Sequence, residues 1–234
     1  YEDNILDSLK WLGLNYDEFH RQSERAPEHK KYLKYLIDKG FAYVSQEEAP
    51  AESGAKDRRR EVIRFKNPNI KVSFKDLIRG DIEVDTTDLK DFVIAKDLDT
   101  PLFHLAVVAD DFDMGVTHVV RGEDHISNTP RQILIQRALG APEPVYAHLP
   151  LILAPDRTKL SKRKGALAIT EYRERGYLPE AVLNYLALLG WNPGTEQEIL
   201  TKDDLLAQFD ISKAQKGGAI FSEEKLRWVN KEYL

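Results

Sequence analysis

Apolar residues recur at helical spacing near the start of the chain and predict two helices. The first spans residues 1–12 and ends before Gly13, and we expect it to be the second half of an amphipathic helix rather than the natural start of a protein. The second is capped near Ser23 and ends at Gly40. Each has one apolar face, so both are expected to pack against a core.

After Gly40 the pattern changes to alternating apolar and polar residues, which is typical of strands buried on one face. Residues 62–65 and 70–74 flank the turn sequence Asn67-Pro68-Asn69 and predict a hairpin. Residues 45–56 are polar and rich in Ala and Glu, so they predict a loop. The other strands expected in this part of the chain are 41–44, 81–85 and 91–95.

Two apolar runs, residues 116–120 and 149–154, predict strands of a buried parallel sheet. The second run is closed by the turn pair Pro155-Asp156. In open α/β sheets, ligands bind outside the carboxyl ends of the strands. The segments that leave these two strands, residues 121–125 and 157–165, are therefore the candidate functional segments.

The remaining elements are expected to be helices. One lies between the two apolar strands, with Pro130 in its first turn, and ends at Gly140. After Gly165 the apolar residues recur at helical spacing, which indicates a small helical domain. Its expected helices are 170–176, 179–190, 201–209 and 222–233.

The composition excludes several classes of protein. Of 234 residues, 42% are hydrophobic and 31% charged, which is typical of a globular protein, and no apolar run is long enough to span a membrane. The start has no cationic and then apolar leader, so we expect no export. The absence of cysteine excludes disulfides and thiolate metal sites and fits a reducing cytoplasm. With a net charge of -5, any contact with nucleic acid must come from local basic patches.

Residues 157–164 form a cationic loop that contains five Lys and Arg residues, with Ser161 and the apolar Leu160 among them. Such a loop suits a polyphosphate, because ammonium groups offset phosphate charge while a hydroxyl and backbone amides donate directional hydrogen bonds. Gly165 lets the chain leave in a backbone conformation closed to other residues. For a bare run of charge, a solvated surface loop is the better interpretation.

Arg121 directly follows the first apolar strand. Its guanidinium could bind a substrate carboxylate through two parallel hydrogen bonds, or form an ion pair with the neighbouring Glu123 or Asp124. The adjacent acids Asp110 and Asp111 suggest a metal site, but we expect them to cap a helix or to be solvated on a loop.

Three histidines also invite a metal site. His118, His125 and His148 have no spacing typical of metal ligands, so we expect them to be packed or exposed.

Lys159-Leu160-Ser161-Lys162-Arg163 resembles the second signature of class I aminoacyl-tRNA synthetases, the KMSKS-type loop, in the form found in glutamyl-tRNA synthetases. Residues 8–25, 117–132 and 176–191 are similar to the same family, so the resemblance covers nearly the whole chain. The first signature of that family, the HIGH-type motif, is absent. We therefore expect this chain to hold only part of an active site.

The resemblance implies an α/β fold, with part of a Rossmann-like catalytic domain, a mixed α/β insertion and then a small all-helical domain. Residues 1–40 and 101–165 would form the catalytic domain. Residues 41–100 would be a shortened insertion that binds the tRNA acceptor end, and residues 166–234 would contact the tRNA stem. Relatives have a longer insertion, some with a zinc held by cysteine. We therefore expect no zinc here and allow for a gap between residues 44 and 60.

The family also implies roles for single residues in binding ATP. Lys159 and Lys162 would stabilise the phosphates during catalysis, and Asp124 would lie by the ribose. The backbone at Leu151 and Ile152 would hold adenine. The remaining ATP-binding residues of the loop would be Leu160, Ser161 and Arg163.

By the same resemblance, Arg121 would read the glutamate substrate. Phe103 stands where the family usually has tyrosine, so it would shape the glutamate pocket without donating a hydrogen bond. A basic run would contact tRNA, with a solvated face as the alternative. Its residues are Arg58, Arg59, Arg60 and Arg64.

The family's reaction is ATP-dependent activation of L-glutamate and its transfer to tRNA(Glu). Mg²⁺ would accompany ATP, and we expect no metal site made by the protein itself. We expect a monomer in the cytoplasm without membrane contact. The nearest alternative is a glutaminyl-tRNA synthetase or a tRNA-modifying relative that activates glutamate. An alternative of another class is a non-catalytic tRNA-binding fragment.

Overall fold

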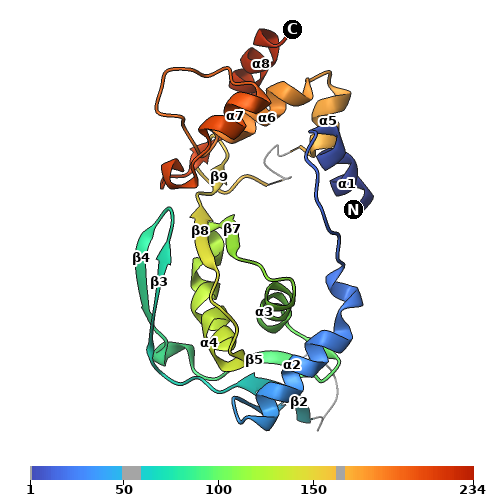
Figure 1. Ribbon diagram of the computed structural model, residues 1–234, viewed down its shortest axis with the longest axis vertical. Helices are drawn as coiled ribbons and strands as arrows, with labels where there is room; N and C mark the ends of the chain where they lie inside the picture. Colours follow the sequence, from blue (N-terminus) through green and yellow to red (C-terminus); the bar gives the residue numbers. More distant parts are fainter. Residues whose placement is uncertain (1, 49–58, 162–166) are drawn as a thin grey trace.

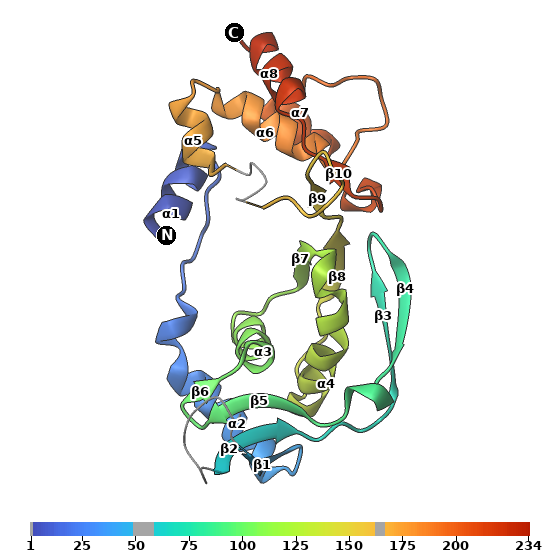
Figure 2. The same ribbon diagram turned by 180° about the vertical axis from the view of Figure 1, so that it is seen from behind.

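The structure is a computed structural model that describes residues 2–48, 59–161 and 167–234. Helices from the last part of the chain gather at the upper end of Figure 1, and sheets and helices share the lower end. Helix α1 (Glu2–Trp11) lies with the upper group, beside α5, in Figures 1 and 2. The upper helices are α5 (Ile169–Glu174), α6 (Pro179–Leu188), α7 (Lys202–Gln208) and α8 (Glu223–Glu232).

The four helices predicted after Gly165 are confirmed to within a few residues. Side chains cap two of them: Ser222 accepts a hydrogen bond from the backbone N–H of Lys225 at 3.1 Å, and Thr201 accepts one from Asp204. This part is not all-helical, because strand β10 (Ala219–Ile220) pairs in parallel with β9 (Ile152–Leu153). The core between these helices is formed by Leu12, Tyr172, Ala181, Val182, Tyr185, Leu189, Leu226 and Val229.

A four-stranded sheet of mixed direction carries the candidate functional segments. Its strand order is β4-β3-β8-β7, in which β7 and β8 are parallel and β3 and β4 form an antiparallel hairpin. Strand β3 meets β8 at the single pair Asp76↔Tyr146. The strands are β3 (Lys71–Asp76), β4 (Gly80–Asp85), β7 (His118–Gly122) and β8 (Val145–Leu149).

Helices α3 (Phe103–Asp113) and α4 (Thr129–Leu139) pack against each other, and α4 also packs against β3. The glycine after α4, Gly140, has a φ of 69°, the left-handed conformation expected of a helix-ending glycine. The strand predicted at residues 116–120 is confirmed as β7, shifted by two residues.

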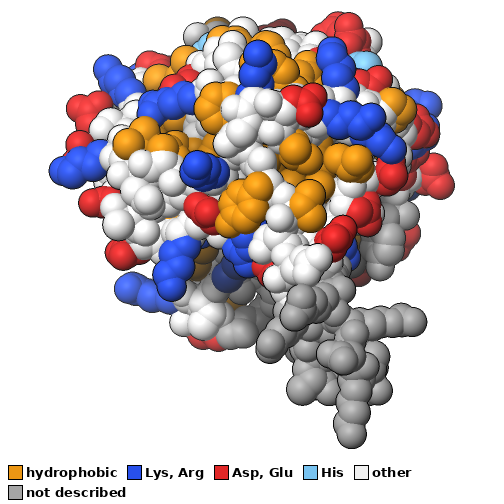
Figure 3. All heavy atoms as spheres, turned by 90° about the horizontal axis from the view of Figure 1, so that it is seen from below, with side chains coloured by type: hydrophobic (Ala, Val, Ile, Leu, Met, Phe, Trp, Pro, Cys, Tyr) orange, Lys and Arg blue, Asp and Glu red, His pale blue; other side chains and the backbone are white. Residues whose placement is uncertain are grey.

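The second sheet is antiparallel, with the order β1-β2-β5-β6, and packs against helix α2 (Ala26–Asp38). Its buried side chains join the main core together with those of α2, α3 and α4. Figure 3 views this end of the molecule, where Lys, Arg, Asp and Glu side chains surround apolar ones. The strands are β1 (Ala42–Glu48), β2 (Arg59–Phe65), β5 (Phe92–Asp97) and β6 (Thr100–Pro101).

Short 3₁₀ helices connect several of these elements. They are η1 (Gln22–Glu24), η3 (Thr87–Leu89), η4 (Glu123–Asn128) and η6 (Ile211–Lys213).

Three predictions about strands were wrong. Residues 45–48 belong to β1 rather than to a loop, and the strands at 62–65 and 70–74 lie in different sheets. The sequence Asn67-Pro68-Asn69 does not form the expected hairpin turn. Instead, the Asn67 side-chain amide donates a hydrogen bond to the carbonyl oxygen of Thr86 at 2.6 Å. The single strand expected at 149–154 is two strands, β8 and β9, since proline at position 150 has no N–H to continue a ladder.

Candidate active site

Arg121 lies near the carboxyl end of β7, directly beside His148 of the parallel strand β8. Its Nε donates to Nε2 of His148 at 3.2 Å, and its Nη2 donates to Oγ1 of Thr129 at 2.7 Å. The guanidinium carbon lies 5.5 Å from the centroid of the Tyr146 ring. Strand β8 and the start of α4 therefore hold the guanidinium with neutral groups.

The positive charge of Arg121 has no carboxylate partner within 4.0 Å in residues 2–48, 59–161 and 167–234. The expected alternative, an ion pair with a neighbouring acid, is wrong. Glu123 instead pairs with Arg79 at 2.7 Å, and Asp124 pairs with Lys159 at 2.6 Å. Burial lowers the pKa of Arg121, so this charge is partly desolvated and would gain strongly from an acidic ligand.

The described half of the cationic loop folds back onto β9. The backbone N–H of Leu160 donates to the carbonyl oxygen of Ile152 at 2.9 Å, and Lys159 bridges to Leu153. This turn directs Nζ of Lys159 to the Asp124 carboxylate, and that hydrogen bond lowers the pKa of Asp124. The structure therefore brings Lys159 to the segment that carries Arg121. Lys162 and Arg163 lie outside the described residues.

The backbone at the expected adenine position is already hydrogen bonded in part. The N–H of Leu151 donates to the Glu123 carboxylate at 3.1 Å, and its carbonyl oxygen accepts from Ala219 at 3.1 Å. The carbonyl oxygen of Ile152 accepts from Leu160. A contact with adenine at this position stays a prediction and would have to use other backbone groups.

Phe103 opens helix α3, and its side chain is 46% exposed. Its ring centroid lies 5.7 Å from that of His125, in the segment that follows Arg121, and 5.5 Å from that of His104. The structure thus places Phe103 at the same edge of the molecule as Arg121.

Comparison with known proteins places the chain in a family. The family described as "tRNA synthetases class I (E and Q), catalytic domain" matches residues 1–52 and 46–228. The chain belongs to this family of synthetases.

Individual relatives agree with this assignment. The synthetase chain is similar to a glutamate–tRNA ligase of Aquifex aeolicus (strain VF5), with 45% identity over 265 residues that cover 100% of this chain and 56% of the relative. It is similar in structure to a glutamate-tRNA synthetase from Elizabethkingia anophelis, with a TM-score of 0.87, 32% identity, and coverage of 100% of this chain and 60% of that one. A glutamate tRNA ligase from Elizabethkingia meningosepticum CCUG26117, solved in complex with its amino acid, gives a TM-score of 0.86 at 31% identity over 99% of this chain and 59% of that one.

The synthetase chain spans a little over half the length of the curated relatives that it matches. The 265 aligned positions of the Aquifex relative exceed the 234 residues of this chain by 31, so that relative has residues that this chain lacks. The family match consists of two segments that meet at residues 46–52, within the region where a shortened insertion was expected.

The structure describes the four arginines expected to contact tRNA to different extents. Arg58 lies outside the described residues, and Arg59 and Arg60 belong to β2, with side chains that are not described. Arg64 is bound within the fold: its guanidinium is paired with Glu47, and its Nη1 donates to the Asp91 carbonyl oxygen at 2.6 Å. A role of Arg64 in binding tRNA stays a prediction.

The expectation that Asp110 and Asp111 cap a helix or lie solvated on a loop was wrong, because both lie within α3. Asp110 is 6% exposed and accepts hydrogen bonds from Nε of Arg25 at 2.7 Å and from Nε2 of His29 at 2.8 Å. Burial alone would raise the pKa of Asp110, but hydrogen bonds from Gln22, Arg25 and His29 lower it. Asp110 thus joins the segment before α2 to α3.

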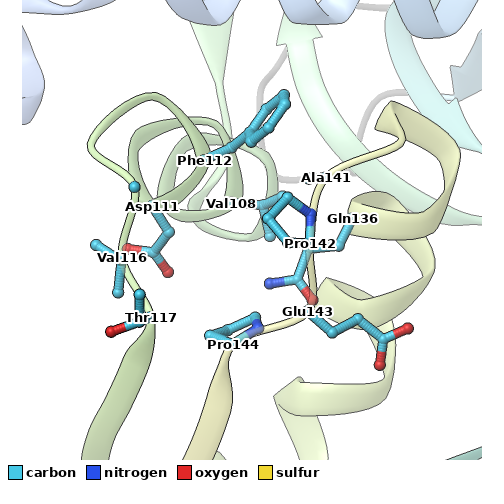
Figure 4. A pocket seen from close by; sticks show the side chains of 11 residues that line it. Val108, Asp111, Phe112, Val116, Thr117, Gln136, Ala141, Pro142, Glu143 and Pro144 are labelled. Atoms are coloured by element: carbon cyan, nitrogen blue, oxygen red, sulfur yellow. The ribbon is translucent and has the colours of Figure 1, made fainter.

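Asp111 lines a cavity of about 170 Å³ near the amino ends of β7 and β8. Figure 4 shows Asp111 and Thr117 on one side of this cavity and Gln136 and Pro142 on the other. Burial raises the pKa of Asp111. The cavity lies at the other end of the strands from Lys159.

The three histidines of the sequence analysis differ in exposure, and His125 is half-buried. His148 is packed, with 0% exposure, and His118 is exposed. No group of three His, Asp or Glu side chains within the described ranges has the arrangement of a metal site. No helix in those ranges is long and apolar enough to cross a membrane.

The sequence pattern gave no role to Asp76 and Thr129, which the structure places behind Arg121. Thr129 lies within the segment 117–132 that resembles the family, so its contact with Arg121 could have been suspected. Asp76 is 72 residues from His148, and the contact between β3 and β8 that joins them has no signal in the sequence.

Proposed function

We propose that this chain is the catalytic part of a glutamate–tRNA ligase, which activates L-glutamate with ATP and transfers it to the 3′ end of tRNA(Glu). The observation that carries the proposal is the half-buried guanidinium of Arg121, held by neutral groups near the carboxyl end of a parallel strand. The family contains synthetases for glutamate and for glutamine. A partly desolvated positive charge favours the substrate that carries a negative side chain.

In the first step an oxygen of the substrate α-carboxylate attacks the α-phosphorus of ATP. The new oxygen–phosphorus bond forms as the bond to the bridging oxygen breaks, and pyrophosphate leaves. Arg121 would bind the side-chain carboxylate through its remaining N–H groups, so that the α-carboxylate points to the nucleotide. The attacking group is already ionised, so this step needs no base from the protein.

Lys159 would bind the phosphates of ATP. Its ion pair with Asp124 joins side chains that are 61% and 39% exposed, and pairs this exposed contribute only about 0–1 kcal/mol. Lys159 can therefore leave Asp124 for a phosphate oxygen at low cost. Asp124, once released, would accept a hydrogen bond from a ribose hydroxyl, as the family resemblance implies.

In the second step a hydroxyl of the terminal ribose of tRNA attacks the activated carbonyl carbon, and AMP leaves. We propose that ATP binds with Mg²⁺ and that the basic run at 58–64 contacts tRNA. A monomeric state and a cytoplasmic location stay predictions.

The test is ATP–pyrophosphate exchange by the intact gene product, with tRNA present and with glutamate, glutamine or no amino acid. We expect exchange that depends on glutamate and is at least about a hundredfold weaker, in kcat/KM, with glutamine. Exchange that depends on glutamine and not on glutamate would instead indicate a glutaminyl-tRNA synthetase. RNA binding without any exchange would show a non-catalytic module.

A further inference from the structure

A line of buried polar side chains leads from β3 through β8 to Arg121. Asp76 is 1% exposed and His148 is 0% exposed. Oδ2 of Asp76 lies 2.6 Å from Nδ1 of His148, and Nε2 on the opposite side of that ring lies 3.2 Å from Nε of Arg121. Each member of this line comes from a different strand, so the sheet itself fixes their order.

The contacts of Asp76 determine which nitrogen of His148 carries the proton. Its carboxylate also accepts the backbone N–H groups of Ile78 at 2.9 Å, Arg79 at 2.8 Å and His148 at 3.0 Å. Burial alone would raise the pKa of Asp76, but these hydrogen bonds lower it, so the group is an ionised acceptor. Nδ1 of His148 must therefore be the donor.

The other nitrogen of His148 is left as an acceptor. Burial lowers the pKa of His148 despite the hydrogen bond to Asp76, so the ring is neutral near pH 7. A neutral ring with its proton on Nδ1 presents the lone pair of Nε2 to the N–H of Arg121. The opposite tautomer would place two N–H groups against each other.

Thr129 completes the support on the side of α4. Its Oγ1 accepts from Nη2 of Arg121 at 2.7 Å, and its hydroxyl can donate either to the carbonyl oxygen of His125 at 3.1 Å or to the lone pair of His148 Nε2 at 3.2 Å. Two of the five N–H groups of Arg121 are thus fixed by uncharged acceptors. Within the described residues no hydrogen bond uses the other three, so they remain for a ligand, while Asp111 attracts the positive charge from beyond ion-pair distance.

We propose that Asp76 and His148 are positioning residues that make Arg121 selective for an acidic substrate. Asp76 locks the tautomer of His148, and His148 orients the guanidinium without neutralising it. A carboxylate at position 148 would cancel the charge, and a donor there would push the guanidinium away. This inference rests on the function proposed above.

The decisive variant is Asp76→Asn in the intact enzyme. The asparagine oxygen, in the place of Oδ1, can keep the backbone N–H groups of Ile78 and Arg79 and accept that of His148, which lies 3.3 Å from Oδ1. Its amide, in the place of Oδ2, donates to Nδ1 and forces the proton of His148 onto Nε2. We expect the KM for glutamate in ATP–pyrophosphate exchange to rise at least about tenfold, with the KM for ATP within about twofold of the wild type. General unfolding would lower the rate without this split.

Two variants at position 148 provide the matched controls. His148→Gln can place its side-chain oxygen where Nε2 lies and still accept from Arg121, so the KM for glutamate should stay within about threefold of the wild type. His148→Leu offers no acceptor and should raise that KM at least about tenfold. A thermal melt of each variant confirms that the assay temperature lies below its Tm.

A direct readout does not depend on activity. In ¹⁵N-histidine-labelled enzyme, the His148 signal, identified by its loss in His148→Gln, should show a protonated Nδ1 in the wild type and a protonated Nε2 in Asp76→Asn.

Three outcomes would overturn the inference: a wild-type His148 with its proton on Nε2, an Asp76→Asn enzyme whose KM for glutamate changes less than twofold, or equal increases in both KM values. Each can occur in an enzyme that activates glutamate normally, which would leave the proposed function standing. A wild type without glutamate-dependent exchange would instead remove the proposed function and, with it, this inference.

Discussion

Arg121 and Lys159 carry the same charge in different settings. Arg121 is partly desolvated and touches neutral acceptors, whereas Lys159 is largely exposed and already paired with Asp124. The first setting is rigid and suits the recognition of one fixed carboxylate. In the second setting the ion pair of Lys159 is easily exchanged for another partner, which suits a charge that must move with the phosphates.

For Lys159, truncation should affect the chemical step. We expect Lys159→Ala to lower kcat for ATP–pyrophosphate exchange by more than about tenfold, because a cation is lost where charge develops. Lys71→Ala is the matched control, since Lys71 is another exposed lysine in an ion pair, with Glu83 at 2.7 Å. Equal rates for the two variants would refute a role of Lys159 at the phosphates.

His104 should make the stability of the protein depend on pH. Burial, with smaller contributions from Arg131 and Arg121, lowers the pKa of His104 from 6.5 to about 4. The unfolded chain takes up this proton first, so stability present above pH 6.5 is lost as the pH falls toward 4.

We expect His104→Leu to reduce the loss of unfolding free energy between pH 7 and pH 4.5 by about 1 kcal/mol, a value discounted for the partial exposure of the ring. Urea titrations at the two pH values measure the free energy of unfolding, with the exposed His118→Leu as control. The same pH dependence in His104→Leu and in the wild type would contradict this account.

At the scale of elements, helix α1 belongs by its contacts to the helices at the far end of the sequence. Leu12, just after α1, lies in one core with Tyr172, Leu226 and Val229. Arg173 of α5 pairs with Asp7 of α1 at 2.9 Å. Helix α2, by contrast, packs in the main core with α3 and β1. The expected grouping of residues 1–40 in one domain therefore stays a prediction, with packing that favours a division between α1 and α2.

This packing can be tested by hydrogen exchange. We expect Leu12→Ala to cost about 2–4 kcal/mol locally and to speed amide exchange in α6 and α8 more than in β7 and β8. Leu33→Ala, at a fully buried position of the main core, should do the reverse. Faster exchange of β7 and β8 in Leu12→Ala would assign α1 to the catalytic core.

Helices were more predictable than strand pairing, because their signals are local. Caps and apolar spacing placed the four C-terminal helices to within a few residues. Strand partners depend on distant contacts, so the hairpin expected around Asn67-Pro68-Asn69 was wrong. The same limit applies to the site. Motifs suggested Arg121 and Lys159, whereas Asp76 reaches His148 only through a pairing that the folded chain creates.

At the scale of the whole molecule, the candidate site lies where the mixed sheet meets the helical part. Strands β9 and β10 pair across this junction. Arg79 spans it as well, because it donates to the carbonyl oxygens of His148 at 3.2 Å and of Lys216 at 2.7 Å. Residues that would hold the substrates are therefore tied to the part expected to contact the tRNA stem. With a net charge of -5, contact with tRNA depends on such local placement of cations.

The central claim is that Arg121, whose guanidinium forms no ion pair with a carboxylate of the described residues, selects an acidic amino acid. The most direct measurement is the ratio of kcat/KM for glutamate to kcat/KM for glutamine, in exchange assays of the intact enzyme and of Arg121→Met. Arg137→Met, which removes an exposed arginine paired with Glu143, is the control. We predict that Arg121→Met lowers this ratio at least about a hundredfold and that Arg137→Met leaves it unchanged. An Arg121→Met enzyme that still prefers glutamate as strongly as the wild type would contradict the account.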